Sequence, residues 1–125
     1  MTANEAPGRT PTQAILEFYA ALRDRRVDDI LALVDPEVVC HPLVRPGLSA
    51  YHGYEGMIRL SEDMHAVHGQ YDFAADRITE DGPTVTVHAR ILPEPAIGQD
   101  ALSVTTEYTL RDGLILTIES EQDSG

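Results

Sequence analysis

The sequence has one cysteine, few basic residues and no long apolar run, and each shortage excludes a class of protein. Because Cys40 is alone, no disulfide can form within the chain, which favours a reducing, cytoplasmic setting. The opening MTANEAPGRT lacks the apolar stretch of a secretory signal peptide. No segment approaches the roughly 20 apolar residues of a membrane-spanning helix. We therefore expect a cytoplasmic protein that does not enter membranes.

The chain is also short of positive charge, with 9 basic against 21 acidic residues and a formal net charge of −12. Nucleic acids, anionic membranes and polyanionic substrates bind basic surfaces, so the sequence argues against all three as partners. Several catalytic motifs are absent as well, including G-x-S-x-G, H-E-x-x-H, the P-loop and the dinucleotide-binding fingerprint. Small neutral ligands remain possible.

The length and the hydrophobic content of the chain are sufficient for one folded domain. The chain has 125 residues, of which 42% are hydrophobic, so a core can form without disulfides. We expect the domain to cover residues 10–121, with flexible ends at 1–9 and 122–125.

Helical signals lie in the first half. A capping box at residues 10–13, with proline at the first helical position, predicts a helix over about 11–25. Apolar residues then recur every three or four positions over about 27–34 and 54–68, which predicts two more helices.

Strand signals dominate the second half, where the apolar period changes from 3.6 to 2. Strands are predicted over 38–41, ended by Pro42, and then over 71–79, 84–92, 103–111 and 114–121. The order α-α-β-α-β-β-β-β is typical of an α+β fold. A curved sheet wrapped over three helices would leave a cone with one open mouth.

Three segments resemble the NTF2-like superfamily, and within it the SnoaL-like group: ILEFYAAL at 15–22, YHGYEGM at 51–57 and YTLRDGLI at 108–115. That group includes ketosteroid isomerases, polyketide cyclases and limonene-type epoxide hydrolases. The resemblance covers about 12–121. It implies a conical barrel with a mostly antiparallel sheet, a buried apolar cavity, homodimers packed sheet to sheet, and no metal or organic cofactor.

The active residues of those relatives match this chain in part. Ketosteroid isomerase uses an Asp base, with a Tyr and a protonated Asp as oxyanion donors. By register the base falls on His41, and the two donors fall on Phe18 and Thr106, so two strong donors are lost. Tyr19, one step from Phe18, is expected to face elsewhere. The Arg-x-Asp of epoxide hydrolases is absent, because Leu92 stands where that Asp would follow Arg90.

His41 is the main candidate for a general base, since imidazole exchanges protons near neutral pH. It would lie at a strand end that faces the cavity. The alternative is a partly exposed histidine bonded to a backbone carbonyl. Cys40 would point to the opposite face, buried or at an interface.

His88 and Arg90 share one face of their strand. If that face lines the cavity, Arg90 could hold a carboxylate or polarise a carbonyl. If the apolar face of the strand lies inward instead, both residues belong to the outer sheet surface or to a dimer interface.

The third helix carries an apolar stripe of Met57, Leu60, Ser61, Met64 and His68 with His65 on its flank, and part of it is expected to line the cavity. The Glu62, His65 and His68 spacing occurs once, which argues against a metal site. The helix dipole alone explains His68. Tyr51 and Tyr108 are possible hydrogen-bond donors to a ligand.

Two functions follow as alternatives. One is a cofactor-independent enzyme of the SnoaL-like type that moves a proton on a small apolar carbonyl ligand, as an isomerase, cyclase or dehydratase. The other is a non-catalytic ligand-binding or dimerising protein of the same fold, paired through the outer face of the 84–121 sheet. The expected catalytic residues are His41, His88 and Arg90. The expected ligand-binding residues are Phe18, Tyr19, Tyr51, Met57, Leu60, Met64, His65, Thr106 and Tyr108.

Overall fold

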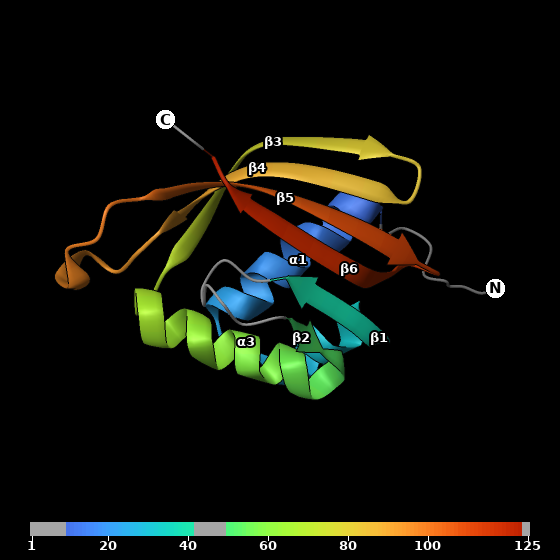
Figure 1. Cartoon of the computed structure of the whole chain (residues 1–125), viewed down its shortest axis with the longest axis horizontal. Coiled ribbons are helices and arrows are strands. Elements are labelled where there is room, and N and C mark those ends of the chain that lie inside the picture. Colours follow the sequence, from blue (N-terminus) through green and yellow to red (C-terminus); the bar gives the residue numbers. More distant parts are fainter. Residues whose placement is uncertain (1–9, 42–49, 124–125) are drawn as a thin grey trace.

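Three helices cover one face of a curved six-stranded sheet in the computed structural model, which describes residues 10–41 and 50–123 (Figure 1). This is the α+β architecture that the sequence predicts. The predicted flexible segment at 1–9 lies outside the described residues. Near the C-terminus the Asp123 amide donates a hydrogen bond to Ser103 O at 2.9 Å. Within the described part of the chain no helix is long and apolar enough to cross a membrane.

Helix α1, Pro11–Arg23, begins with the predicted capping box. The Gln13 amide donates to Thr10 Oγ1 at 3.1 Å, and the Thr10 amide donates to Gln13 Oε1 at 2.8 Å. The helix ends two residues earlier than predicted, because Arg25 takes a left-handed conformation with φ 58°. Its buried face presents Ile15, Phe18, Tyr19 and Leu22 to the sheet.

Helix α2, Val27–Leu33, leads directly into strand β1, Val34–His41, which is longer than the predicted strand. A two-residue strand β2, Tyr51–His52, pairs with β1 and was not predicted. Helix α3, Gly53–His68, follows at once. The second glycine of the YHGYEG segment, Gly56, is required here, because a Cβ at this position would lie 2.8 Å from the backbone of Tyr51.

The remaining strands form an antiparallel meander: β3 Asp72–Asp81, β4 Thr84–Leu92, β5 Leu102–Arg111 and β6 Leu114–Gln122. A short 3₁₀ helix, Pro95–Ile97, lies between β4 and β5. The sheet order is β2-β1-β6-β5-β4-β3, and it is mixed because β1 pairs with β6 in parallel. Register shifts between β1 and β6, β3 and β4, and β5 and β6 accompany the curvature. The sheet is not closed into a barrel, since β2 and β3 remain its two edges.

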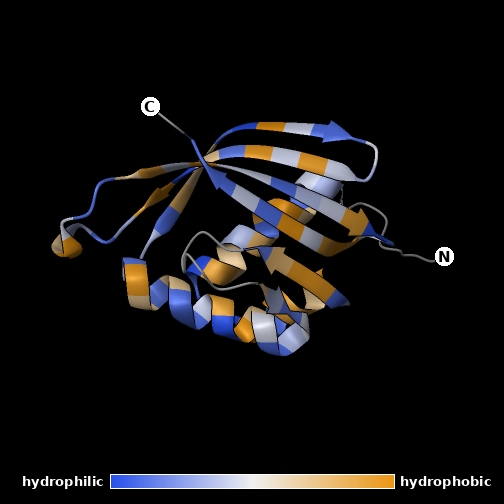
Figure 2. Ribbon diagram, in the orientation of Figure 1, coloured by the Kyte–Doolittle hydropathy of each residue, from blue (hydrophilic) through white to orange (hydrophobic). Residues whose placement is uncertain are grey.

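The apolar side chains of the sheet and of the helices form one buried core. Figure 2 shows hydrophobic and hydrophilic positions alternating along the strands. Along β4 the buried residues are Val85, Val87, Ala89 and Ile91, which alternate with more exposed ones. Of the two orientations left open for this strand, the apolar face therefore lies inward. This alternation decides which polar residues can reach the interior of the fold.

One ion pair joins the start of β1 to the end of β5. Asp35 is buried and accepts hydrogen bonds from the Arg111 guanidinium at 3.0 Å and from the Glu37 amide at 2.8 Å. The Glu37 amide, and after it Arg111, lower the pKa of the Asp35 carboxyl. These hydrogen bonds compensate the free-energy cost of burying the Asp35 carboxylate beside the core.

Candidate functional site

A cavity of about 140 Å³ lies between helices α1 and α3 and the concave face of the sheet. Its wall is mostly apolar and is contributed by Phe18, Leu22, Leu60, Met64, Val67, Phe73, Ile91, Leu102, Val104 and Ile118. The polar lining residues are Tyr19, Cys40, His68, Thr106, Tyr108 and Ser120. None of the described residues that line it is Asp, Glu, Lys or Arg.

Four of the residues that line this cavity carry hydroxyl groups. The Tyr108 hydroxyl donates to the Tyr19 hydroxyl at 2.8 Å, and Thr106 Oγ1 lies 2.9 Å from Ser120 Oγ. Thr106 and Tyr108 are two positions apart on β5, so they point to the same face. Among the residues that the structure describes, nothing accepts the proton of Tyr19. The Tyr19 hydroxyl therefore keeps a proton that it can donate.

Burial keeps these groups in their neutral forms. It raises the pKa of Tyr19 to about 12, an effect that the hydrogen bond from Tyr108 partly offsets. The pKa of Tyr108 is also raised well above its usual value, first by burial and then by the neighbouring Tyr19. Burial raises the pKa of Cys40 to about 12, so it is a thiol and not a nucleophilic thiolate at neutral pH.

His68 lies in the last turn of α3 and is buried. Its Nδ1 is 3.3 Å from Gln99 Oε1, and Gln99 Nε2 donates to Val67 O at 3.0 Å. Because the Val67 carbonyl accepts from the amide NH₂, the amide oxygen is left to accept from His68 Nδ1–H. The neutral ring then has its lone pair on Nε2, the state that a general base requires.

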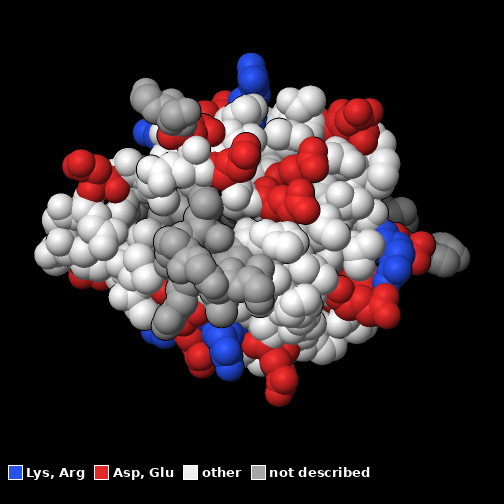
Figure 3. Space-filling view, in the orientation of Figure 1, with Lys and Arg blue, Asp and Glu red and all other residues white. Residues whose placement is uncertain are grey.

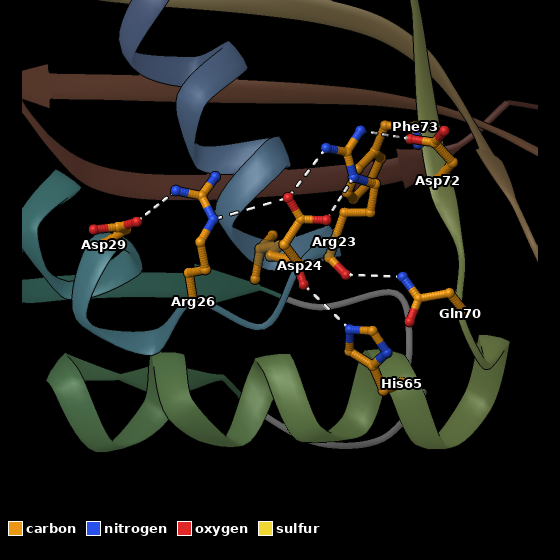
Figure 4. Close-up of polar contacts among 9 residues, drawn as sticks. Arg23, Asp24, Arg26, Asp29, His65, Gln70, Asp72 and Phe73 are labelled. Carbon is orange, nitrogen blue, oxygen red and sulfur yellow. Dashed lines mark hydrogen bonds and ion pairs between the residues drawn. The ribbon is translucent and has the colours of Figure 1, made fainter.

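A second polar network, outside the cavity, fastens the end of α1 to α3 and β3 (Figure 4). His65 Nε2 is 3.2 Å from Leu22 O, and the Gln70 side chain donates to Arg23 O at 3.2 Å. Arg23 in turn contacts Asp24 and, at 3.3 Å, Asp72. His65 is thus committed to a backbone carbonyl and does not line the cavity, contrary to the prediction.

The other predicted ligand-binding residues divide into two groups. Those that line the cavity are Phe18, Tyr19, Leu60, Met64, Thr106 and Tyr108. Tyr51 and Met57 do not. The Tyr51 hydroxyl donates to Asp63 Oδ2 at 2.5 Å, and Met57 is fully buried in the core. The expectation that Tyr19 faces elsewhere is wrong, because it lines the cavity beside Phe18.

The predicted cavity position of His41 is also wrong. His41 is exposed, and the neighbouring Cys40 points into the cavity instead. His41 pairs in register with Glu119 of the neighbouring strand β6. Adjacent strand residues face opposite ways, so only one of the two could reach the interior.

His88 and Arg90 lie on the outer face of the sheet and not in the cavity. Arg90 is exposed and pairs with Asp76, with both of its hydrogen bonds at 3.0 Å. His88 Nδ1 is 3.0 Å from Thr105 Oγ1, whose hydroxyl donates to Asp123 at 2.7 Å. The proposed contact of Arg90 with a ligand carboxylate is therefore not available on the cavity side.

Sequence reasoning missed His68, Cys40 and Ser120 as cavity residues. The signal for His68 was present, because it completes the buried stripe of α3. For Cys40 and Ser120 there was no signal other than the alternation of inward and outward residues along a strand. Among the described residues no group of three or more His, Cys, Asp or Glu side chains could hold a metal ion.

The raised tyrosine pKa values predict a loss of stability at alkaline pH. An unfolded tyrosine ionises near pH 10, whereas Tyr19 does so only near 12 in the folded chain, so its contribution is complete below pH 10 and is lost as the pH rises through 12. In Tyr19→Phe the fall in melting temperature above pH 10 should be shallower than in the parent. The exposed Tyr54→Phe is the control, and an equal effect of both variants would contradict the assignment.

The Gln99 contact predicts one imidazole tautomer. Nitrogen NMR of the neutral protein should show His68 with its proton on Nδ1, and Gln99→Leu should move population toward the Nε2–H form because the acceptor is gone. Gln70→Leu is the matched control, since that amide is bonded to Arg23 O and not to His68. An Nε2–H tautomer in the parent would refute the hydrogen-bond direction.

Comparison with known structures gives one consistent architecture. TerC co-crystallised with polyporic acid is 27% identical, with a TM-score of 0.72 over 91% of this chain and 92% of TerC. A candidate SnoaL-like polyketide cyclase from Jannaschia sp. CCS1 is 18% identical, with a TM-score of 0.74 over 98% and 92% of the two chains. A candidate ketosteroid isomerase from Kribbella flavida DSM 17836 is 17% identical, with a TM-score of 0.73 over 92% and 78%.

No curated protein sequence gives a significant match. The family model of the SnoaL-like domain matches residues 15–118, which run from within α1 to within β6. The chain therefore belongs to the SnoaL-like domain family, within the NTF2-like fold.

Proposed function

We propose that the cavity binds a small carbonyl compound and moves a proton at the carbon next to its carbonyl group. The observation that supports the proposal is that a hydrogen-bond donor and an imidazole line the same apolar cavity. Tyr19 has a hydroxyl proton with no acceptor among the described residues, and His68 has an imidazole whose Nδ1 is engaged by Gln99. A hydrogen-bond donor and a base are the two parts that enolisation requires.

Tyr19 would act on the carbonyl oxygen. As the carbon loses its proton, negative charge develops on that oxygen, and a hydrogen bond to it strengthens. Tyr108 supports the role by donating to Tyr19, which leaves the Tyr19 proton for the ligand. Because the surrounding wall is apolar, the interaction is stronger than it would be in water.

His68 would take the proton. Its Nε2 lone pair accepts the proton from the α-carbon, the C–H electrons form the enolate, and the imidazolium returns the proton to the same carbon or to a conjugated one. The second step regenerates the neutral ring, so no cofactor or co-reactant enters the balance. Gln99 would act as a positioning residue that holds the productive tautomer.

Similar proteins give independent support. The structures that resemble this chain include a candidate ketosteroid isomerase and candidate polyketide cyclases. TerC, which is 27% identical to this chain, was crystallised with polyporic acid. His41, His88 and Arg90 have no part in the proposal, because their side chains lie away from the cavity. The homodimer through the outer sheet face stays a prediction from the resemblance.

Isomerisation of β,γ-unsaturated ketones tests the reaction. The parent should convert cyclohex-3-enone to the conjugated ketone, measured by ultraviolet absorbance, and 5-androstene-3,17-dione is assayed in parallel as a larger ketone of the same type. His68→Gln should lower kcat about 100-fold or more, because it removes the base. Tyr19→Phe should lower kcat about tenfold or more, because it removes the donor to the enolate.

His88→Gln provides the matched control, since it makes the same change on the outer face of the sheet. Its kcat should equal that of the parent. If His68→Gln retains parental turnover, the proposed base is wrong. If the parent binds these ketones and isomerises neither, the protein is a ligand-binding member of the family.

A further inference from the structure

We infer that the ligand is an uncharged compound with a single six-membered ring and a carbonyl oxygen that accepts from Tyr19. The inference deepens the proposed function and rests on it for the identity of the site. It is carried by the volume of the cavity, the rigidity of its aromatic wall and the neutrality of its lining.

The volume limits the ligand to about one ring. A cavity of about 140 Å³ is comparable with the roughly 150 Å³ apolar cavity that holds benzene in another protein. Pockets for drug-sized ligands have volumes of roughly 300–1,000 Å³. A four-ring steroid would therefore need a much larger space than the helices and sheet leave here.

The aromatic wall opposes widening of the cavity. Tyr19 stacks on Phe73 with ring centroids 4.3 Å apart and 24° between the planes. Tyr108 meets Tyr19 and Phe18 edge to face, at 6.1 and 6.3 Å. These contacts tie α1 to β3 and β5, so moving one ring to admit a second ligand ring would break favourable pairs. Met64, on the α3 side, can adapt to the outline of a small ring.

The lining disfavours a charged ligand. Its tyrosine and cysteine side chains are neutral at physiological pH, and no Lys or Arg lies among its described residues. A carboxylate would lose its hydration there without gaining a permanent cation. The net charge of −12 adds long-range repulsion, and acidic side chains are scattered over the face of the molecule seen in Figure 3. An uncharged carbonyl needs only the single donor that Tyr19 supplies.

Methyl NMR of the methionines gives a direct test with defined probes. Met64 lines the cavity, whereas Met57 is buried in the core outside it and serves as the internal control. Acetophenone should shift the Met64 methyl resonance in a saturable way and leave that of Met57 nearly unchanged. Benzoate, which has the same shape but is charged, and acetonaphthone, which has a second ring, should bind at least tenfold more weakly.

Two variants test the contacts. Tyr19→Phe should weaken acetophenone binding about two- to tenfold, the worth of one hydrogen bond, and leave toluene binding unchanged. Val104→Phe should fill the cavity and abolish binding of both probes. Leu102→Phe replaces it if Val104→Phe does not fold, because Leu102 lines the cavity from a less buried position.

Three results would overturn the inference: benzoate or acetonaphthone binding as tightly as acetophenone, no saturable shift of Met64, or undiminished binding in the cavity-filling variant. The outcome is separable from that of the proposed reaction. If acetophenone binds as described and cyclohex-3-enone is not isomerised, the reaction fails and the ligand class stands. If only the steroid ketone is isomerised, the reaction stands and the ligand class fails.

Discussion

A hydrogen bond of 2.8 Å between the hydroxyls of Tyr108 and Tyr19 joins strand β5 to helix α1 inside the fold. Both rings are buried, and a buried hydroxyl without a partner would destabilise the protein by roughly 1–3 kcal/mol. The bond therefore sets how α1 lies against the sheet, and the stacked ring of Phe73 reinforces that position from β3. The apolar residues of α3 and of the sheet line the other sides of the cavity.

The other end of the site depends on how α3 finishes. Gly69 ends the helix with φ 68°. The segment between β4 and β5 packs against the last turn of α3. There the Glu94 amide donates to His68 O at 3.0 Å, and the Gln99 side chain contacts His68 and Val67. These contacts place an oriented imidazole on the cavity wall. Ile91 of β4 and Leu102 of β5, which flank this segment, line the cavity. The segment between β4 and β5 therefore affects both the orientation of the His68 ring and the shape of the cavity.

Periodicity predicted most of the fold, because the apolar residues of α1, α3 and β4 repeat at 3.6 or 2 positions with few exceptions. It could not predict β2, whose two residues are held by pairing with β1 and have no period of their own. The site was harder. To place His41 inward, one must know which face of a short strand is buried. A shift of one residue along that strand puts Cys40 inside in place of His41. The importance of His68 depends on Gln99, a partner 31 positions away that no local pattern indicates.

In the proposed function a carbonyl ligand lies between the Tyr19 hydroxyl and the His68 imidazole. A crystal structure of the protein with cyclohex-2-enone, the product of the proposed isomerisation of cyclohex-3-enone, tests it most directly. We expect the carbonyl oxygen about 3 Å from Tyr19 Oη, with the α-carbon of the ketone facing His68 Nε2. A ketone bound on the outer sheet face, or one in the cavity whose oxygen lies away from Tyr19, would contradict the proposed function.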